Sequence, residues 1–212
     1  MIERTAIIIG GGPAGSSCAY ALNRAGIDTL ILDKQPFPRP KLCAGWITPR
    51  VLHKLDLWPQ RYPGSLTLFD HLHVHVYGHY IPLSSRQYAI RRAEFDHFLL
   101  SRAGVPFEQH RAADIKQENG QYIIDDAFRC TYLIGAGGTG CAVYRTFFRN
   151  ASPRPRSVQI TTLELEFQTA YTDPRCQLWF FEQGLPGYAW YVPKDGGTIN
   201  IGIGAKASPL LS

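Results

Sequence analysis

The chain has 212 residues, of which 45% are hydrophobic and 18% are charged, a balance typical of soluble globular proteins rather than disordered ones. The net charge of +5 is modest and the Lys and Arg residues are scattered, which argues against nucleic-acid binding. Five cysteines without a Cys-x-x-Cys pair, and no hydrophobic run long enough to cross a membrane, predict a soluble cytoplasmic protein with free thiols.

The first predicted elements form a strand, a turn, a helix and a second strand. Ala6–Ile9 is a hydrophobic run typical of a buried strand, and Gly10–Gly15, with the sequence GGGPAG, is a glycine-rich turn. Ser16–Ala25 has helical spacing, and Thr29–Leu32 is a second strand that ends on Asp33. This order is that of a dinucleotide-binding βαβ unit.

Each residue of this unit has a physical role if a dinucleotide binds there. Gly10 permits the tight turn, Gly12 leaves room for a pyrophosphate, and Gly15 lets the helix lie close to the strand. The N–H groups at the start of the helix attract phosphate, and the Asp33 carboxylate can accept hydrogen bonds from an adenosine ribose. The predicted cofactor-binding residues of this unit are Gly10, Gly12, Pro13, Ala14, Gly15, Asp33 and Lys34.

The next segment is predicted to be an extended loop followed by a short helix. Three prolines between Gln35 and Pro40 exclude a regular helix. Pro49–Leu55 is expected to be helical, with Thr48 as its N-terminal cap. Residues 67–83 then alternate in the manner of two strands, and Arg92–Leu100 returns to helical spacing.

Three alternating histidines stand out in the predicted strands. His71, His73 and His75 place three imidazoles on one strand face, a pattern that could ligate a metal. No carboxylate or cysteine completes an obvious ligand set. We therefore expect a partly exposed sheet face and no metal site.

A second group of strands precedes another glycine-rich turn. Val105–Ile115, Tyr122–Ile124 and Cys130–Ile134 are predicted strands, and Asp125-Asp126 is interpreted as a turn rather than a catalytic carboxylate pair. Gly135–Gly140 is the second glycine-rich turn.

The part of the chain after Pro153 is predicted to be antiparallel sheet, with strands at Val158–Thr169, Gln177–Glu182, Tyr188–Val192 and Thr198–Ile203. The expected fold class is α/β: a Rossmann-like domain with a parallel sheet, interleaved with an antiparallel β domain. We assign residues 1–66 and 89–150 to the nucleotide-binding domain and residues 67–88 and 151–212 to a substrate domain.

The order of motifs resembles the flavin-dependent geranylgeranyl reductase family, within the wider group that includes aromatic flavin hydroxylases. Four motifs carry the resemblance: the glycine turn with Asp33, the loop Lys41–Gly45 (KLCAG), the helix start Arg92–Asp96 (RAEFD) and the strand Gly187–Pro193 (GYAWYVP). They occur in the family's order and extend over nearly the whole chain.

The resemblance implies FAD as cofactor, with its adenosine on the first glycine turn and with Arg92, Gly135 and Gly138 as further binding residues. It places Cys43 near the flavin, where a thiol could position substrate or deliver a proton. Tyr188 and Trp190, on one face of a strand, would form an aromatic wall for an apolar, isoprenoid-like substrate. The alternative for all three is ordinary packing, and Cys18 is expected to be packing only.

The implied reaction is hydride transfer from reduced flavin to an isoprenoid double bond, with possible contact at a membrane surface. Gly137 replaces the Asp that in the wider group helps to bridge the flavin and nicotinamide phosphates, which argues against direct use of NAD(P)H. The electron donor is left open between NAD(P)H and a ferredoxin-type protein. The chain stops at Ser212, before the family's Gly-Asp-Ala-Ala-Gly turn, which predicts a fragment or a shortened relative. The alternatives are a flavin monooxygenase or halogenase, and a non-catalytic nucleotide-binding remnant.

Overall fold

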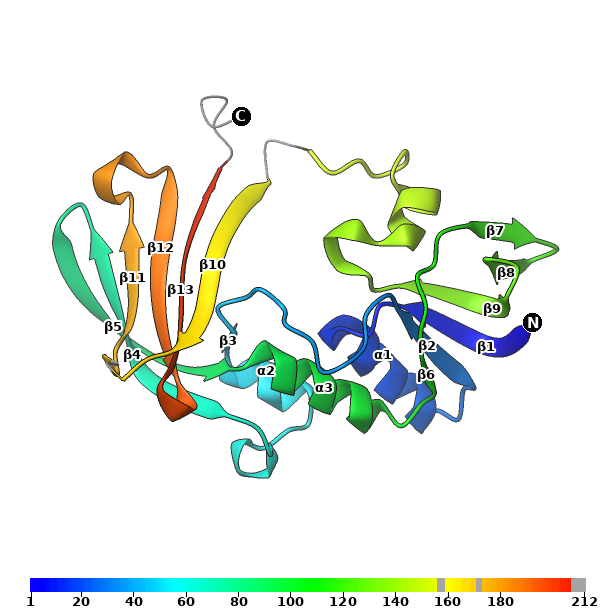
Figure 1. The fold of residues 1–212 in the computed structure, drawn as a ribbon, viewed down its shortest axis with the longest axis horizontal. Helices are drawn as coiled ribbons and strands as arrows, with labels where there is room; N and C mark the ends of the chain where they lie inside the picture. Colours follow the sequence, from blue (N-terminus) through cyan, green and yellow to red (C-terminus); the bar gives the residue numbers. More distant parts are fainter. Residues whose placement is uncertain (156–158, 171–172, 207–212) are drawn as a thin grey trace. The chain divides into compact units, whose positions relative to one another are not determined.

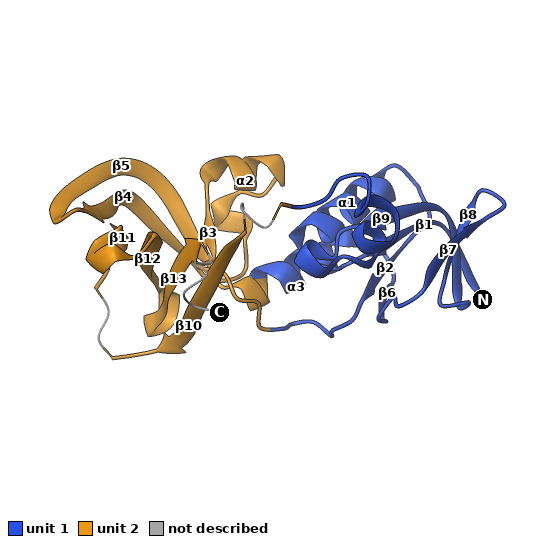
Figure 2. Cartoon of the chain, turned by 90° about the horizontal axis from the view of Figure 1, so that it is seen from above, with its two compact units in different colours: residues 1–39, 95–154 blue, residues 40–94, 155–212 orange. Residues whose placement is uncertain are grey.

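The computed structural model describes residues 1–155, 159–170 and 173–206 (Figure 1). The chain forms two compact units, each built from two separate stretches (Figure 2). Unit 1 comprises residues 1–39 and 95–154, and unit 2 comprises residues 40–94 and 155–212. Each unit contains one sheet, one largely parallel and one largely antiparallel, which confirms the predicted fold class.

The unit boundaries differ from the expected domain boundaries. Residues 40–66 and 89–94, which we assigned to the nucleotide-binding domain, lie in unit 2, whereas residues 151–154 lie in unit 1. The reason is that strands far apart in the sequence pair with each other. Trp46 pairs with Ala89, so the segment after Arg39 joins the sheet of unit 2.

The sheet of unit 1 has six strands. Their order across the sheet is β6 (Phe107–Gln109), β2 (Thr29–Asp33), β1 (Ile2–Ile9), β9 (Phe128–Gly135), β8 (Gln121–Ile124) and β7 (Ile115–Glu118). The first four are parallel, and β8 and β7 are antiparallel to their neighbours. Alternate residues of β1 are buried on opposite faces, because Ile8 packs with Ala19 and Leu100 while Ile7 packs in a second cluster.

Two helices contribute to one of these clusters. Helix α1 (Pro13–Arg24) begins at a proline. Proline lacks a backbone N–H, which costs nothing there because N–H groups of the first helical turn have no acceptor within the helix. Gly26, which has a φ of +72°, follows the end of the helix. Helix α3 (Arg92–Ala103) supplies Leu100 and Ala103.

The predicted strand Val105–Ile115 is wrong, because the segment divides into β6 and β7. Between them, the N–H groups of Ala113 and Asp114 donate to the Asp125 carboxylate instead of to a strand. His110 Nε2 also lies 2.7 Å from Asp125 Oδ2. Burial raises the pKa of Asp125, but these hydrogen bonds outweigh it and hold the pKa below its usual value. Asp125 and Asp126 both have positive φ, which confirms the turn.

The sheet of unit 2 has seven strands. Their order is β10 (Ile160–Gln168), β13 (Thr198–Lys206), β12 (Gly187–Lys194), β11 (Cys176–Phe180), β4 (Leu66–Val76), β5 (His79–Ile90) and β3 (Trp46–Ile47). One part of the antiparallel prediction is wrong, because β11 runs parallel to β4. Val158, the first residue of another predicted strand, lies outside the described residues.

Short helical segments complete the architecture. Helix α2 (Pro49–Lys54) has Thr48 at its N-cap position, but the Thr48 hydroxyl makes no capping hydrogen bond, so that part of the prediction is wrong. Single helical turns occur at Pro59–Arg61, Gly138–Gly140, Tyr144–Phe148, Glu182–Gly184 and Asp195–Gly197. None of the helices formed by the described residues is long and apolar enough to span a membrane.

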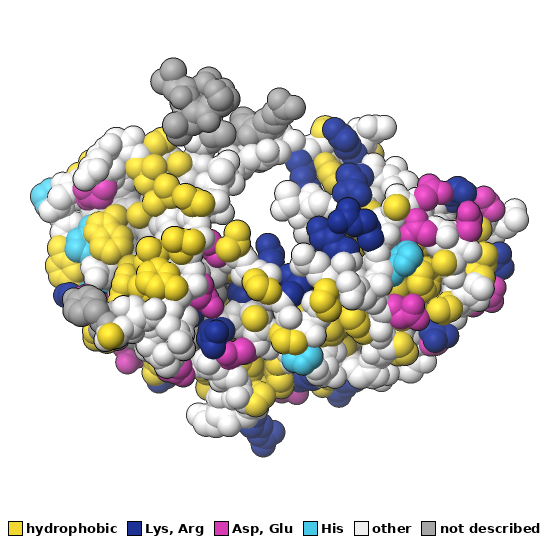
Figure 3. Space-filling model, viewed as in Figure 1, with side chains coloured by type: hydrophobic (Ala, Val, Ile, Leu, Met, Phe, Trp, Pro, Cys, Tyr) yellow, Lys and Arg dark blue, Asp and Glu magenta, His cyan; other side chains and the backbone are white. Residues whose placement is uncertain are grey.

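The two faces of the unit 2 sheet differ. Trp190, Leu178 and Val74 form a core on one face, which we call the inner face. The opposite face carries the histidines of β4 and, towards β10, exposed Leu163 and Leu165. Figure 3 shows hydrophobic side chains gathered over the strands of this sheet, and Lys and Arg side chains gathered over the segment after β9.

Candidate functional site

The first glycine turn, between β1 and α1, is packed backbone to backbone. A Cβ on Gly15 would lie 1.8 Å from the carbonyl oxygen of Gly10. Gly10 has a φ of +114°, and a Cβ there would lie 2.5 Å from the carbonyl oxygen of Ala136 in the second glycine-rich turn. The fold therefore requires glycine at both positions.

Gly12 is different, because nothing in the fold requires glycine there. Its φ is −71°, which any residue can adopt, and a Cβ would meet no atom within 4 Å. Gly12 is also the N-cap of α1, where no side chain makes a capping bond and the first turn has no acidic residue. The predicted Pro13 and Ala14 are the first two helical residues. This start of α1 is an open position with N–H donors and positive dipole, suited to an anion.

Asp33 ends β2 and is 8% exposed. Its Oδ2 accepts a hydrogen bond of 2.8 Å from the Gly11 N–H, and its Oδ1 accepts one of 3.0 Å from the Gln35 N–H. Asp33 therefore fixes the glycine turn to the end of β2, a structural role that the sequence did not indicate. A carboxylate has about four acceptor positions, so capacity remains for ribose hydroxyls. The neighbouring Lys34 is exposed.

Arg39 is a residue that the sequence analysis did not select. Its Nη2 lies 3.7 Å from Asp33 Oδ2, and its guanidinium lies over the Phe37 ring, 4.7 Å from the centroid. Its Nε is buried and has no hydrogen-bond partner among the described residues. An arginine a few residues after an acidic strand end was the available sign, because arginine forms charge-assisted hydrogen bonds with phosphate groups.

The second glycine-rich turn follows β9. A Cβ on Gly135 would lie 2.8 Å from the Val143 side chain, and Gly138 has a φ of +68° with open space around it. Arg145 donates to the Gly140 carbonyl at 2.6 Å, and Arg154 donates to the Thr139 carbonyl at 3.1 Å. Packing and conformation explain these two glycines, and their cofactor-binding roles stay predictions.

In unit 2, the Cys43 loop is fixed against the ends of β5 and β13. Gly45 has a φ of +73°, and a Cβ there would lie 2.0 Å from the Ile90 carbonyl oxygen, while the Ile90 N–H donates to the Gly45 carbonyl at 2.8 Å. Asn200 Nδ2 donates to the Cys43 carbonyl at 3.5 Å. The Cys43 thiol is half-buried and accepts from the Gly45 N–H at 3.5 Å.

A buried polar group supports this loop. The Trp190 indole N–H donates to Asn200 Oδ1 at 2.7 Å, and Asn200 is only 1% exposed. Asn200 Nδ2 also lies 3.4 Å from Glu166, whose carboxylate forms an ion pair with the fully buried Lys194 side chain. Asn200, Lys194 and Glu166 were missed. The only sign was the polar character of Asn200 and Lys194 within largely apolar strands, and Glu166 gave no sign.

Tyr188 and Trp190 share the inner face, as predicted, with ring centroids 5.5 Å apart. Trp190 belongs to the buried core, whereas Tyr188 is half-buried. The packing interpretation therefore holds for Trp190, and contact with a substrate stays a prediction for both rings.

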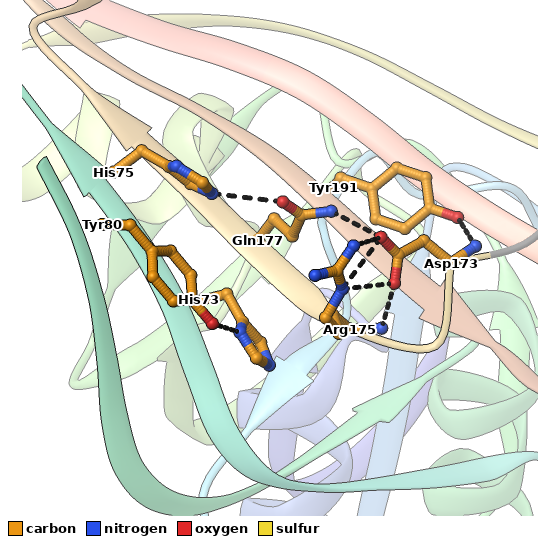
Figure 4. Close-up of polar contacts among 7 residues, drawn as sticks. All are labelled: His73, His75, Tyr80, Asp173, Arg175, Gln177 and Tyr191. Atoms are coloured by element: carbon orange, nitrogen blue, oxygen red, sulfur yellow. Dashed lines mark hydrogen bonds and ion pairs between the residues drawn. The ribbon is translucent and has the colours of Figure 1, made fainter. Parts of the chain in front are cut away.

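Two of the three histidines of β4, His73 and His75, bond to neighbouring side chains (Figure 4). His73 Nδ1 lies 2.5 Å from the Tyr80 hydroxyl, and His75 Nε2 lies 3.2 Å from Gln177 Oε1. Burial, assisted by Arg175 and His71, lowers the pKa of His73 below its ordinary value. The described part of the chain contains no group of His, Cys, Asp and Glu side chains arranged to hold a metal ion.

The predicted residues thus fall into two sets. Within unit 1, the structure brings together both glycine turns and Asp33. Within unit 2, it brings together the Cys43 loop and Trp190 through Asn200. Arg92, half-buried at the start of α3, belongs to unit 2, so its predicted contact with cofactor phosphates stays a prediction.

The sequence is similar to a known domain family and to several characterised reductases. Residues 8–55 match the NAD(P)-binding Rossmann-like domain. The chain is 27% identical to the menaquinone reductase of Mycolicibacterium smegmatis over 95% of this chain and 55% of the relative. It is 28% identical to digeranylgeranylglycerophospholipid reductase 1 of Methanopyrus kandleri over 98% of this chain and 59% of the relative.

A solved structure shows the same fold. The geranylgeranyl bacteriochlorophyll reductase-like protein of Thermoplasma acidophilum superposes with a TM-score of 0.80 at 23% identity, over 97% of this chain and 57% of that one. The chain is therefore a distant homologue of geranylgeranyl reductases, as the motifs predicted, and also of menaquinone reductases, which the motifs did not indicate. It spans little more than half of their length.

The two glycines of the first turn give a matched pair of variants. Gly15→Ala should lower the free energy of unfolding by about 1–3 kcal/mol, because the new methyl overlaps the Gly10 carbonyl. Gly12→Ala should change it by less than about 1 kcal/mol, because the position is open. Urea unfolding measures both, and an equal loss in the two variants would contradict the assignment.

The thiols should differ in reactivity. Burial raises the pKa of Cys130 to about 11 and of Cys176 to about 12, so both remain protonated and unreactive at about pH 8. Iodoacetamide should therefore modify the half-buried Cys43 well before these two, as measured by peptide mass spectrometry. Modification of Cys176 as fast as Cys43 would disprove this order.

Asn200 should control the Cys43 loop. Asn200→Ala removes the hydrogen bonds to Trp190 and to the loop carbonyl, and should both destabilise the protein by about 1–3 kcal/mol and speed alkylation of Cys43. Trp190→Phe removes the indole bond and part of the buried ring but keeps the bond between Asn200 and the loop carbonyl, so it should destabilise the protein while changing the alkylation rate less than Asn200→Ala does. If both variants alter Cys43 alike, the loop is not held by Asn200.

Proposed function

We propose that this chain is the nucleotide-binding and substrate-binding part of an FAD-dependent oxidoreductase that reduces carbon–carbon double bonds of an isoprenoid-like substrate. The observation that carries the proposal is Gly12, a glycine that the fold does not need at the uncapped start of α1. A Cβ would occupy the space that a pyrophosphate needs there.

Unit 1 supplies the groups that an adenosine diphosphate requires. The N–H groups of the first turn of α1 can donate to the phosphates, and Asp33 can accept from the ribose. Arg39 adds a guanidinium beside Asp33, with a buried Nε that has no partner among the described residues. These are the groups that the adenosine diphosphate part of FAD would contact at the start of α1.

Unit 2 supplies the groups for an apolar substrate. FAD, when bound, provides a hydride from its reduced ring. Reduction of a double bond also needs a proton, and the Cys43 thiol, on a loop held by Gly45 and Asn200, is our candidate source. Tyr188 and Trp190 would orient the substrate chain and exclude water.

The relatives support the substrate class, because their names refer to menaquinone and to a digeranylgeranyl lipid, which both carry isoprenoid chains. We propose that the substrate of this chain is likewise an apolar small molecule with an isoprenoid-like chain. The protein would be cytoplasmic and would bind this substrate at a membrane surface. The electron donor is NAD(P)H or a ferredoxin-type protein.

FAD titration of the purified chain tests the proposal. Wild-type protein should bind FAD and release it on denaturation, whereas Gly12→Ala should bind at least about tenfold more weakly while remaining folded. Gly140→Ala is the matched control, because it adds a methyl to another loop glycine with no atom closer than 3.9 Å. A folded wild-type chain that takes up no FAD would instead support a non-catalytic remnant.

The reaction itself is tested with FAD-loaded protein and an isoprenoid alcohol under anaerobic reducing conditions. Mass spectrometry should detect addition of two hydrogen atoms per double bond. Substrate-dependent oxygen consumption with an oxygenated or halogenated product would identify a monooxygenase or halogenase instead.

A further inference from the structure

Strand β10 contains a single buried residue, and that residue is a glutamate. Glu164 is 8% exposed, whereas every other residue of β10 is exposed. Glutamate is rarely buried in proteins unless another group pairs with it. The burial of this carboxyl group therefore has to be explained by what surrounds it.

The strand register places Glu164 on the inner face, in one row with Trp190. Glu164 pairs with Gly202 of β13, and Gly202 pairs with Trp190 of β12 (Figure 1). Residues paired across neighbouring strands share one face of the sheet. A Cβ on Gly202 would lie 2.3 Å from the Trp190 ring, so this ring crosses above β13 towards Glu164.

This row lies in the middle of the candidate site of unit 2. Tyr188 belongs to the next row on one side, and Asn200 belongs to the next row on the other. Asn200 donates to the Cys43 carbonyl and so supports the Cys43 loop. The Glu164 carboxyl group therefore lies between an aromatic ring of the candidate site and the support of its thiol loop.

Glu164 differs from the neighbouring glutamate on the same face in its lack of a partner. The Glu166 carboxylate pairs with the buried Lys194 ammonium, and it also lies 3.8 Å from Arg91 Nε and 3.4 Å from Asn200 Nδ2. None of the hydrogen bonds and ion pairs formed by the described residues involves the Glu164 side chain. The donors that the fold supplies at this face are therefore used by Glu166.

A buried carboxyl group without a donor lowers the stability of the folded protein. Removing a polar group from water costs free energy unless a hydrogen bond replaces the lost water, and a buried group without a partner requires a reason. Proteins commonly give up stability at positions that serve function. A bound molecule that brings its own donor would satisfy Glu164.

We infer that Glu164 recognises a hydroxyl group on an uncharged, otherwise apolar small molecule whose body lies against Trp190. The hydroxyl group donates to the carboxylate, and the negative acceptor makes this hydrogen bond stronger than a neutral one. The same negative charge repels a phosphate or diphosphate group at this point. Glu164 thereby selects alcohols and excludes anionic ligands.

The recognition of a hydroxyl group stands on the burial, register and missing partner of Glu164. Its assignment to an isoprenoid alcohol rests on the proposed function.

Urea unfolding of the unliganded protein tests whether the fold needs Glu164. Glu164→Met replaces the carboxyl group with an apolar chain of similar length, and should raise the midpoint urea concentration because it removes an unpaired buried charge. Glu166→Met is the matched control on the same face, and should lower the midpoint because it leaves the Lys194 ammonium without its partner. A lower midpoint in both variants would make Glu164 a structural residue and overturn the inference.

Calorimetric titration with three matched probes tests the recognition. Geraniol carries a hydroxyl group, geranyl methyl ether lacks the hydroxyl proton, and geranyl phosphate carries an anion in its place. Wild-type protein should bind geraniol at least about tenfold more tightly than either of the other two probes. Equal affinity for the three probes would overturn the inference.

Two substitutions separate the acceptor from the charge. Glu164→Met should lose both preferences, whereas Glu164→Gln keeps an acceptor oxygen and should lose only the discrimination against geranyl phosphate. Glu118→Gln, which changes an exposed carboxylate of unit 1, should bind all three probes as wild type does. Unchanged preferences in Glu164→Met would mean that solvent satisfies the carboxylate, and would overturn the inference.

A second probe pair separates this inference from the proposed function. Naphthol and its methyl ether differ in the same hydroxyl group but carry no isoprenoid chain. A preference for naphthol that Glu164→Met abolishes, without any binding of geraniol, would contradict only the isoprenoid substrate. Reduction of an isoprenoid by a protein whose affinities ignore the hydroxyl group would contradict only the role of Glu164, and failure to bind either alcohol would overturn the inference.

Discussion

The backbone contact between the two glycine turns is the constraint on which unit 1 depends. The carbonyl of Ala136 lies where a Cβ of Gly10 would be, and the carbonyl of Gly10 lies where a Cβ of Gly15 would be. This contact brings the ends of β1 and β9 together with the start of α1. The Asp33 carboxylate then fixes the turn to β2 through the Gly11 N–H. The open position at Gly12 exists because its neighbours are fixed so closely.

Unit 2 also combines glycines in close contact with a buried side chain that forms hydrogen bonds. Gly45 allows the Cys43 loop to lie directly on the Ile90 carbonyl, and Gly202 allows the Trp190 ring to lie on β13. A buried polar side chain, Asn200, then connects ring and loop. In both units, glycine permits a close approach and one buried hydrogen-bonding side chain fixes it. The loop that carries the half-buried Cys43 thiol and the ring of Trp190 are thereby both attached to the sheet of unit 2.

The homology to geranylgeranyl and menaquinone reductases relates the glycine turn of unit 1 to the aromatic inner face of unit 2. The chain spans little more than half of those relatives, yet the part that it contains has a dinucleotide-type turn in one unit and an aromatic inner face in the other. A nucleotide-bound redox group and an apolar substrate require these two kinds of surface.

The sequence alone determined the elements whose cause is local. The Gly10–Gly15 turn, helix α1, the strand ending at Asp33 and the Tyr188–Trp190 alternation follow from neighbouring residues, because turn conformation and side-chain period are set within a few positions. The motif order was also sufficient to predict the homology. The roles predicted for Cys43, Arg92 and the cofactor-binding glycines remain predictions.

Only the tertiary structure decided what depends on residues distant in sequence. The Val105–Ile115 segment is interrupted between β6 and β7, where Asp125 accepts hydrogen bonds from Ala113 and Asp114. The parallel pairing of β11 with β4 could not be predicted, because the alternation within a strand does not specify its partner or their relative direction. Asn200 and Lys194 read as isolated polar residues in apolar strands until folding places them beneath the Cys43 loop and beside Glu166. Burial turned each of them into a required partner, since a buried polar group must be satisfied by whatever the fold brings near it.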